Sequence, residues 1–450
     1  MNNQEIKNYN YDIIIVGGGI TGTAMLYLLS KYTSLQSIAL VEKCAEFAQI
    51  NSNNTSNSQT LHFGDIETNY SLEKALTVKE AAEMVEGYLL NTSHSRETIY
   101  SKSHKMALAV GKKEVKALKE RFEAFKNSYP KLKLIDREEI GKIEPQVVAG
   151  RNSQEEISAI LSPDGYILNY KALAKSFAQK ARQQVGKNID IFLNTPLEKI
   201  SKKDDGYKLK TNKGTLRSKV VIFAAGAHSL MFAKSLGYGQ DYFLLPVAGN
   251  FYAANQKVLN GKVYTLQKEK LPFAAVHGDP DVHNRNEVRF GPTAKVIPVL
   301  ERRNIKTFWE FLKTNSLDLK VVGSLLKIIS DKDILGFILQ NLAYDIPFLG
   351  KHYYIQTIKK IIPSASSQKL DFKKRIGGIR PQIVNKETKE LIMGIGEIVG
   401  DHIIFNITPS PGATACLQTA RNTIRKLAGF LGEEFVFEED KLTADLKNRN

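Results

Sequence analysis

Cysteine and tryptophan are the scarcest residues of this chain, which has two cysteines and one tryptophan among 450 residues. Cys44 and Cys416 lie far apart in the sequence and form no CxxC pair. This spacing excludes a disulfide framework and a dithiol reductase, because both need paired cysteines. It also suits a reducing compartment, so we expect a cytoplasmic protein.

Long apolar runs are missing as well. No stretch of about 20 uncharged apolar residues is present, which is the length that a helix needs to cross a bilayer. The first ten residues are polar, so we expect no signal peptide. We find no internal repeat and no second GxGxxG motif. We therefore expect one dinucleotide site rather than the FAD and NAD pair of a reductase.

The charge is unbalanced toward the basic side, with 63 Lys and Arg, 47 Asp and Glu and a formal net charge of +16. Such a balance favours anionic partners, namely nucleic acid, acidic lipid or an anionic substrate, or it reflects a generally lysine-rich composition. The lysines are dispersed, without the dense basic and aromatic clusters of RNA-binding proteins. We expect no nucleic-acid partner, and a tRNA-modifying flavoprotein stays open as an alternative.

The N-terminal stretch at 11–43 has the pattern of a nucleotide-binding βαβ unit. A β-branched apolar run at 12–16 suits a buried parallel strand. A glycine-rich turn follows directly, then an apolar helical pattern and a second apolar run at 38–41. The turn reads Gly17-Gly18-Gly19-Ile20-Thr21-Gly22.

Three glycines of this turn, and the acidic residue that follows the second strand, have physical roles in dinucleotide binding. Gly17 permits a tight turn, Gly19 lets a pyrophosphate approach the backbone, and Gly22 lets the helix pack closely on the strand. Glu42 places a carboxylate where ribose hydroxyls bind, and it disfavours a 2′-phosphate. The unit therefore predicts FAD or NAD rather than NADP.

The length of the chain exceeds one ordinary core, so we expect two domains that are interleaved along the sequence. The predicted fold class is α/β (α+β overall), with a Rossmann-type FAD-binding domain and a substrate domain of a β-sheet plus helices. We place the discontinuous FAD-binding domain at 1–75, 155–237 and 371–440. The substrate or cap domain takes 76–154 and 238–370, with a helical region at 304–362.

Five patches of sequence carry a family resemblance. They are the βαβ unit, Asn51–Tyr70, Pro246–Phe251 with His277 and Phe290–Ala294, Gly378–Gln382, and Ser410–Thr414. On these patches the chain resembles the malate:quinone oxidoreductases, FAD-dependent enzymes of the glycine-oxidase and D-amino-acid-oxidase type. The L-2-hydroxyglutarate oxidases are a close second.

The resemblance implies a noncovalently bound FAD that takes a hydride from a 2-hydroxy acid, first of all malate, and passes electrons to a membrane quinone. An L-2-hydroxyglutarate oxidase or dehydrogenase, and an amino-acid or amine oxidase, are the alternatives on the same fold. No metal is expected. The expected cofactor-binding residues are Gly17, Gly19, Ile20, Thr21, Gly22, Glu42, Lys43, Asn57, Thr60, Leu61, Leu197, Ala225, Gly226, Pro411, Gly412, Ala413 and Thr414.

A second argument supports cofactor binding by the segment at 411–414. A helix that starts at Gly412 or Ala413 would aim its positive end at any anion in front of it. In the resembling flavoproteins this position faces the N1–C2 carbonyl edge of the flavin, where negative charge develops on reduction.

Oxidation of a 2-hydroxy acid requires a base that takes the hydroxyl proton, and a histidine has a suitable pKa. His277, beside a predicted strand of the substrate domain, is the first candidate for the base. His62, in the loop expected to pass near the flavin, is the second. Arg380 is the candidate for binding the substrate carboxylate, because a planar guanidinium makes a bidentate contact that lysine does not make.

The helical region at 304–362 is the candidate for membrane contact. It contains the single tryptophan, Trp309, and strongly apolar stretches at 321–329 and 334–339 with interspersed lysines. Amphipathic helices of this composition lie in a lipid interface, or they pack on a domain core. A quinone acceptor in the bilayer favours peripheral attachment to the inner face of the cell membrane.

The purified protein is expected to be yellow, with one tightly but noncovalently bound FAD per chain. The loop at 51–64 has no cysteine and a single histidine, His62, that could form a covalent link. Acid precipitation, followed by absorbance spectra of supernatant and pellet, is the measurement. A colourless protein that binds NAD, or a flavin retained on the precipitated polypeptide, would contradict this prediction.

Overall fold

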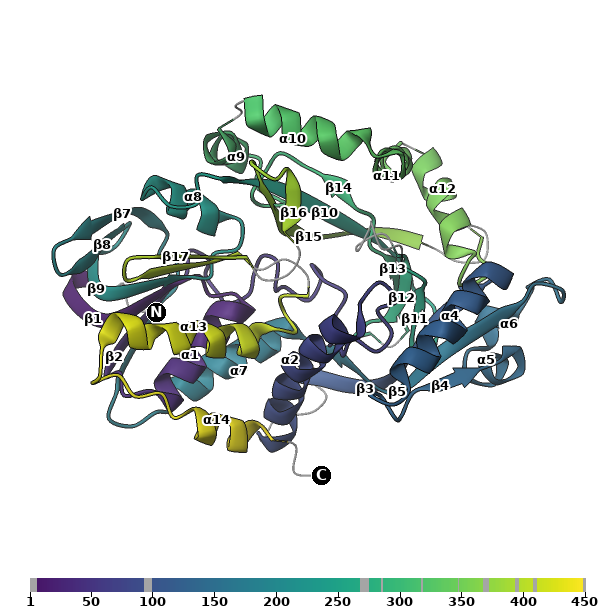
Figure 1. Ribbon diagram of the computed structural model, residues 1–450, viewed down its shortest axis with the longest axis horizontal. Coiled ribbons are helices and arrows are strands. Elements are labelled where there is room, and N and C mark those ends of the chain that lie inside the picture. The colour runs from purple at the N-terminus through teal and green to yellow at the C-terminus, as the bar shows by residue number, and fades with distance from the viewer. Residues whose placement is uncertain are drawn as a thin grey trace.

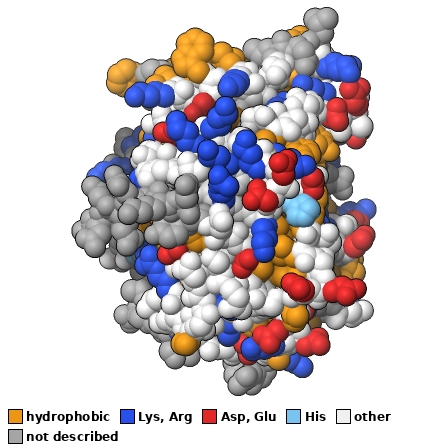
Figure 2. Space-filling view, turned by 90° about the vertical axis from the view of Figure 1, so that its left-hand side faces the viewer, with side chains coloured by type: hydrophobic (Ala, Val, Ile, Leu, Met, Phe, Trp, Pro, Cys, Tyr) orange, Lys and Arg blue, Asp and Glu red, His pale blue; other side chains and the backbone are white. Residues whose placement is uncertain are grey.

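The computed structural model describes residues 6–92, 99–267, 275–284, 286–316, 319–346, 348–366, 372–392, 396–407 and 411–447. Two β-sheets and the helices that cover them make up these residues (Figure 1). On the face that Figure 2 shows, Lys and Arg side chains gather in the upper half, and hydrophobic side chains lie above them at the top. The arrangement confirms the predicted fold class.

The first sheet contains the βαβ unit. Its order is β17-β18-β9-β1-β2-β6, and β1 runs parallel to both β2 and β9. Ile13, Ile14 and Ile15 are completely buried, because both faces of this parallel sheet are covered. The bounds are β1 Ile6–Val16, β2 Ser37–Val41, β6 Asn188–Phe192, β7 Leu197–Lys203, β8 Gly206–Thr211, β9 Gly214–Phe223, β17 Gly396–Gly400 and β18 Ile403–Ile407.

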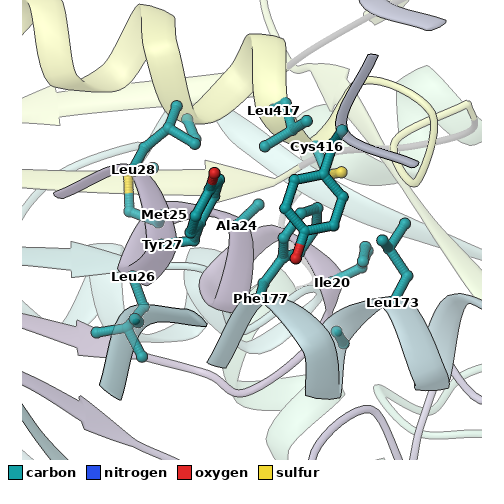
Figure 3. Close-up of a cluster of buried hydrophobic side chains, with 14 of the residues drawn as sticks. Ile20, Ala24, Met25, Leu26, Tyr27, Leu28, Leu173, Phe177, Cys416 and Leu417 are labelled. Atoms are coloured by element: carbon teal, nitrogen blue, oxygen red, sulfur yellow. The ribbon is translucent and has the colours of Figure 1, made fainter. Parts of the chain in front are cut away.

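Helix α1 (Ile20–Tyr32) is buried nearly all round, because two helices pack against it on one face of this sheet. These are α7 (Tyr170–Arg182) and α13 (Cys416–Leu431), and Figure 3 shows their side chains on those of α1. Tyr27 of α1 stacks on Phe177 of α7 with ring centroids 5.6 Å apart. The packing fixes the N-terminus of α1, which faces the expected phosphate site.

Other elements complete the two layers around the first sheet. Helices α2 (Leu72–Asn91) and α14 (Glu439–Leu446) add to the layer of α1. Helix α8 (His228–Ser235) and the β7–β8 hairpin cover the opposite face, where they bury the alternate side chains of β1 and β9.

The second sheet is mostly antiparallel, with the order β16-β15-β10-β13-β12-β11-β3-β5-β4. β14 pairs with β10, and β11 runs parallel to β3. The bounds are β3 Tyr100–Val110, β4 Lys133–Ile135, β5 Ile157–Leu168, β10 Tyr242–Ala254, β11 Lys262–Thr265, β12 His277–Pro280, β13 Val288–Gly291, β14 Lys295–Val296, β15 Phe372–Asn385 and β16 Glu390–Ile392.

Helices also cover the second sheet. Helix α4 packs its apolar side on β3 and β5, and α12 packs with α5 and α6 in a separate core. The predicted helical region at 304–362 contains α9 to α12, which lie along the top of Figure 1. The bounds are α4 Lys112–Phe125, α5 Arg137–Ile143, α6 Pro145–Val148, α9 Thr307–Asn315, α10 Leu319–Ser330, α11 Lys332–Ala343 and α12 Leu349–Ile358.

The two sheets draw on alternating segments of the chain. β5 and β15 fall within the segments predicted for the FAD-binding domain, 155–237 and 371–440, yet both strands pair in the second sheet. The reason is strand pairing, because β5 pairs along its length with β3 and β15 pairs with β10. The domain bounds themselves stay a prediction.

Candidate functional site

A cavity lies where the two sheets meet. The first sheet lines it with the glycine turn and the ends of β2 and β9, and the second sheet with Gly249 and Phe251 of β10 and residues 378–381 of β15. All the predicted cofactor-binding residues line it except Gly22 and Leu61. These two lie behind the wall, since Gly22 faces the backbone of Gly17 and Leu61 is buried in the core around α1.

The glycine turn has the geometry that a pyrophosphate requires. Gly17 has a φ of +116°, which a residue with a side chain rarely adopts, and a Cβ there would overlap the carbonyl oxygen of Ala224. A Cβ at Gly22 would overlap the carbonyl oxygen of Gly17. The N-terminus of α1 at Ile20 faces the cavity with the positive end of its dipole.

The carboxylate of Glu42 lies at the end of β2 on the cavity wall. Its Oε2 accepts a hydrogen bond from Gly18 N at 2.5 Å, and its Oε1 accepts one from Cys44 N at 2.7 Å. These backbone donors hold an anionic acceptor beside the glycine turn, which is the position of a ribose in this type of unit.

Next to Glu42, the predicted residue Lys43 lines the cavity together with His228, Glu301 and Glu310, which the sequence did not single out. Lys43 forms an ion pair with Glu301, and His228 Nε2 lies 3.1 Å from Glu310 Oε2. Burial lowers the pKa of His228 more than the hydrogen bond to Glu310 raises it. His228, Glu301 and Glu310 come from distant parts of the chain, so no local motif pointed to them.

The loop after residue 51 forms the wall near the second sheet. Asn57 Nδ2 donates to the carbonyl oxygens of Asn51 and Asn53, at 3.2 and 2.8 Å, and so shapes the loop itself. Tyr170 of α7 donates its hydroxyl to the carbonyl oxygen of Thr60 at 2.6 Å. The loop is therefore tied to the helix layer of the first sheet.

His62 lines the cavity, and its position is fixed at two points. Its backbone N–H donates to Thr414 Oγ1 at 3.1 Å, and its Nδ1 lies 2.6 Å from Glu67 Oε1. Burial opposes ionisation of Glu67, but the hydrogen bond and charge of His62, together with Lys105, lower the pKa of Glu67 to about 2. A histidine paired with a carboxylate is a suitable general base.

His277, the first candidate for the base, is not among the residues that line the cavity. Its ring stacks on Tyr264 at 4.3 Å between centroids, and its Nδ1 lies 2.5 Å from Asp279 Oδ2. The same carboxylate pairs with Lys262 at 3.0 Å, and that ammonium also donates to Thr60 Oγ1 at 2.8 Å. Burial lowers the pKa of His277, although Asp279 opposes this shift.

Arg380 lines the cavity from β15. Its Nη1 is buried and has no hydrogen-bond partner among the described residues. Burial lowers the pKa of Arg380 to about 10, while nearby Tyr264 opposes the shift. The side chain stays charged at neutral pH, so this wall presents a cation with free donors to an anionic ligand.

Pro411, Gly412, Ala413 and Thr414 line the cavity, but the helix after them starts later than expected. Helix α13 begins at Cys416, and residues 411–415 form turns in front of it. Thr414 Oγ1 accepts a hydrogen bond from the backbone N–H of His62, and this bond holds the turn outside the helix. Ser410 lies outside the described residues.

The residues present fit FAD. The tight glycine turn accommodates a pyrophosphate, Glu42 suits a ribose, and the cavity continues past the turn at Ala225 and Gly226 to the second sheet. A group that extends beyond the dinucleotide-binding turn would therefore reach His62 and Arg380. FAD, when bound, supplies the two-electron acceptor for hydride transfer.

Comparison with known proteins identifies the family. The family described as FAD dependent oxidoreductase (DAO) matches residues 12–424. A probable malate:quinone oxidoreductase of Campylobacter jejuni is 42% identical over 98% of this chain and 100% of that protein. The malate:quinone oxidoreductase of Helicobacter pylori (strain 26695) is 39% identical over 95% of this chain and 96% of its own length.

More distant similarities extend to one further relative in sequence and one solved structure in fold. The human mitochondrial L-2-hydroxyglutarate dehydrogenase is 26% identical over 91% of this chain and 86% of its own length. The FAD-bound L-α-glycerophosphate oxidase of Mycoplasma pneumoniae has a TM-score of 0.64 and 21% identity, over 93% of this chain and 94% of that chain. FAD is thus the cofactor, as predicted. The chain belongs to the FAD-dependent oxidoreductases and, among them, to the family of the malate:quinone oxidoreductases.

Proposed function

We propose that this chain oxidises malate to oxaloacetate and passes the two electrons to a membrane quinone, which becomes the quinol. The 42% identity to a probable malate:quinone oxidoreductase over nearly the whole chain carries this proposal. The cavity supports it, because Arg380 offers a substrate carboxylate a buried Nη1 that has no partner among the described residues, and His62 offers a base.

Each side chain has a distinct part in this reaction. Arg380 binds and orients the carboxylate. His62 takes the proton of the substrate hydroxyl while the carbon that bears this hydroxyl loses its hydride to FAD. His62 is favoured over His277 because it lines the cavity, whereas His277 lies beneath it, between Tyr264 and Asp279.

A panel of substrates tests the proposed function. Malate is expected to reduce the flavin of the purified holoenzyme faster than L-2-hydroxyglutarate, lactate or amino acids do, and a soluble quinone is expected to reoxidise it. Stopped-flow absorbance at the flavin band is the measurement. Faster reduction by L-2-hydroxyglutarate or by an amino acid would transfer the proposal to the corresponding alternative. Retention on RNA at moderate salt would favour a tRNA-modifying flavoprotein.

Replacing Arg380 with Lys should weaken substrate use while FAD stays bound, because lysine keeps the charge but loses the two-pronged geometry. The loss of one charge-assisted contact, about 1.5–3 kcal/mol, corresponds to about ten- to a hundredfold in kcat/KM. Arg375→Lys is the matched control, since Arg375 lies on the same strand, is partly exposed and pairs with Glu287. Equal kinetics for both variants would remove Arg380 from the site.

Replacing His62 with Gln should slow anaerobic reduction of the flavin by substrate about 10²- to 10⁴-fold, which is the usual contribution of a positioned base. His277→Gln, made in parallel, should have the smaller effect. The reverse order of the two variants would assign the base to His277.

For contact with the membrane we propose the apolar helical surface, which comprises the exposed apolar side chains of α9 to α12 and of Phe348. In α10 and α11 these side chains recur with the spacing i, i+4, i+7, so each helix exposes a stripe. The stripes are Val322, Leu326 and Ile329 on α10 and Leu335, Leu339 and Leu342 on α11, with Trp309 on α9 and Leu349 and Tyr353 on α12.

This surface is unusual for a layer that only packs on a domain core. Phe348 is fully exposed and Trp309 is 72% exposed, while Val321 on the other side of α10 is buried against the second sheet. Large exposed apolar patches mark protein or membrane contacts. No helix among the described residues is long and apolar enough to cross a bilayer. The attachment we propose is peripheral, on the cytoplasmic face of the membrane.

The holoenzyme should co-sediment with liposomes, more strongly when anionic lipid is present, and added salt should reduce binding without abolishing it. Basic residues contribute about 1 kcal/mol each near an anionic surface, and burial of the apolar stripes does not depend on salt. Leu326→Glu combined with Leu339→Glu should abolish binding. Val185→Glu is the control, because Val185 is 98% exposed but belongs to the loop before β6. Equal binding of both variants would leave the helices as a packed layer.

A further inference from the structure

The loop that carries His62 holds a second ionisable group, Glu67, to which the proposed function gives no part. Its side chain is only 2% exposed, and its Oε1 lies 2.6 Å from His62 Nδ1. Its Oε2 is buried without a hydrogen-bond partner among the described residues. An unsatisfied buried carboxylate oxygen destabilises the fold, so its presence calls for an explanation.

The contact with Glu67 determines what His62 offers to the cavity. A carboxylate accepts hydrogen bonds and donates none, so Nδ1 of His62 must carry the proton of this bond. In the neutral imidazole Nε2 is then the free acceptor. The backbone bond from His62 to Thr414 keeps the ring on the cavity wall. Glu67 thus selects one tautomer and one orientation of the ring.

The backbone of Glu67 is in turn held by a helix that covers the second sheet. Arg121 of α4 donates to the carbonyl oxygens of Glu67 at 2.8 Å and of Tyr70 at 2.9 Å, and its guanidinium lies 3.8 Å from the ring centre of Phe125. Arg121 also donates to the carbonyl oxygen of Gly64 at 3.3 Å. One guanidinium therefore binds both ends of the segment on which Glu67 lies.

A buried ion pair fixes the same segment at a second point. Lys105 of β3 is completely buried, and its Nζ lies 2.6 Å from Asp65 Oδ1. Its charge also acts on Glu67, since it helps to lower the pKa of that carboxyl. The position of Glu67 is thus set by β3 and α4, which are remote in sequence from the glycine turn.

We propose that Glu67 is a positioning residue, which holds His62 with Nδ1 protonated and Nε2 free toward the substrate, and that Arg121 holds the segment that carries Glu67. This inference rests on the proposed role of His62 as the base. In the reaction the hydroxyl proton passes to His62 Nε2, the hydride leaves the carbinol carbon for FAD, and Glu67 stays ionised throughout.

Glu67→Gln is the decisive variant, because it preserves the shape of the side chain but removes its charge and lets its amide donate to Nδ1. We expect flavin reduction by substrate to slow about 10- to 100-fold, the range seen when a partner that orients a metal-bound histidine is removed. Binding of malonate, a dicarboxylate that cannot be oxidised, should stay unchanged in a flavin-absorbance titration, since Arg380 is intact. Glu123→Gln is the control, since Glu123 lies on α4 with a side chain 63% exposed.

Arg121→Lys extends the test to the group that holds the segment. Lysine keeps the positive charge but cannot bind several carbonyl oxygens in the plane of a guanidinium. We expect a smaller slowing than for Glu67→Gln, again with unchanged binding of malonate. An unchanged rate would remove Arg121 from the proposal. Weakened binding of malonate in either variant would indicate a general disturbance of the site and overturn the positioning role.

A spectroscopic measurement tests the tautomer without any turnover. Proton–nitrogen correlation spectra of ¹⁵N-histidine-labelled holoenzyme distinguish protonated Nδ1 from protonated Nε2, and the signal lost in His62→Gln identifies His62. We expect protonated Nδ1 in the wild type and in Glu123→Gln, and loss of this preference in Glu67→Gln. The same tautomer in Glu67→Gln, or a wild-type rate of flavin reduction by that variant, would overturn the proposal.

The two readouts separate this inference from the proposed function. If malate fails to reduce the wild-type flavin, the proposed substrate is wrong, while the tautomer of His62 and its dependence on Glu67 are still decided by the spectra. If malate reduces the wild type but Glu67→Gln behaves like Glu123→Gln, the proposed function stands and the positioning role is excluded.

Discussion

Two buried lysines of the second sheet hold the loop at 57–70, and the cavity depends on these contacts. Lys105 pairs with Asp65, and Lys262 pairs with Asp279 while it donates to Thr60. Both lysines are completely buried. Removing such charges from water costs a large desolvation free energy, so the pairs add little net stability compared with apolar contacts. What they supply is a defined position for a polar loop that has few apolar side chains of its own.

That position explains why the site lies where it does. The first sheet presents the carboxyl ends of its parallel strands, the place where open α/β sheets bind nucleotides. The second sheet lines the same cavity and presents Arg380 from β15. The loop joins the two, because His62 bonds to Thr414 in front of α13 while Glu67 is held by Arg121 of α4. Cofactor and substrate groups thus come from different sheets and meet only after the sheets have packed.

The same second sheet connects the cavity with the apolar helical surface. One side of α10 packs on Phe243 and Val384 of β10 and β15, and the other side exposes Leu326. A helix that is apolar on two sides needs two apolar environments, and only one of them is inside the protein. In the proposed function the second environment is the lipid that contains the quinone. The quinone and the strands that face the flavin would then lie on opposite sides of one helix layer.

The sequence by itself determined the local chemistry of this protein. The βαβ unit, with Gly17, Gly19 and Glu42, could be predicted because a short strand, a tight turn and a helix depend on neighbouring residues. The segments that carry His62, Arg380 and residues 411–414 were singled out through a family resemblance, and all of them line the cavity. The start of the helix after residues 411–414 was misplaced by a few residues, because the bond from His62 to Thr414 is not a local signal.

The tertiary structure alone decided which side chains act together. His277 was the first candidate for the base on chemical grounds, but β11 and β12 place it against Tyr264 and Asp279 under the cavity wall. The ion pair of Lys43 with Glu301 and the hold of Arg121 on the loop join residues that are far apart in the chain. Such pairs depend on strand register and on the packing of two sheets, and neither periodicity nor short motifs encode these distances.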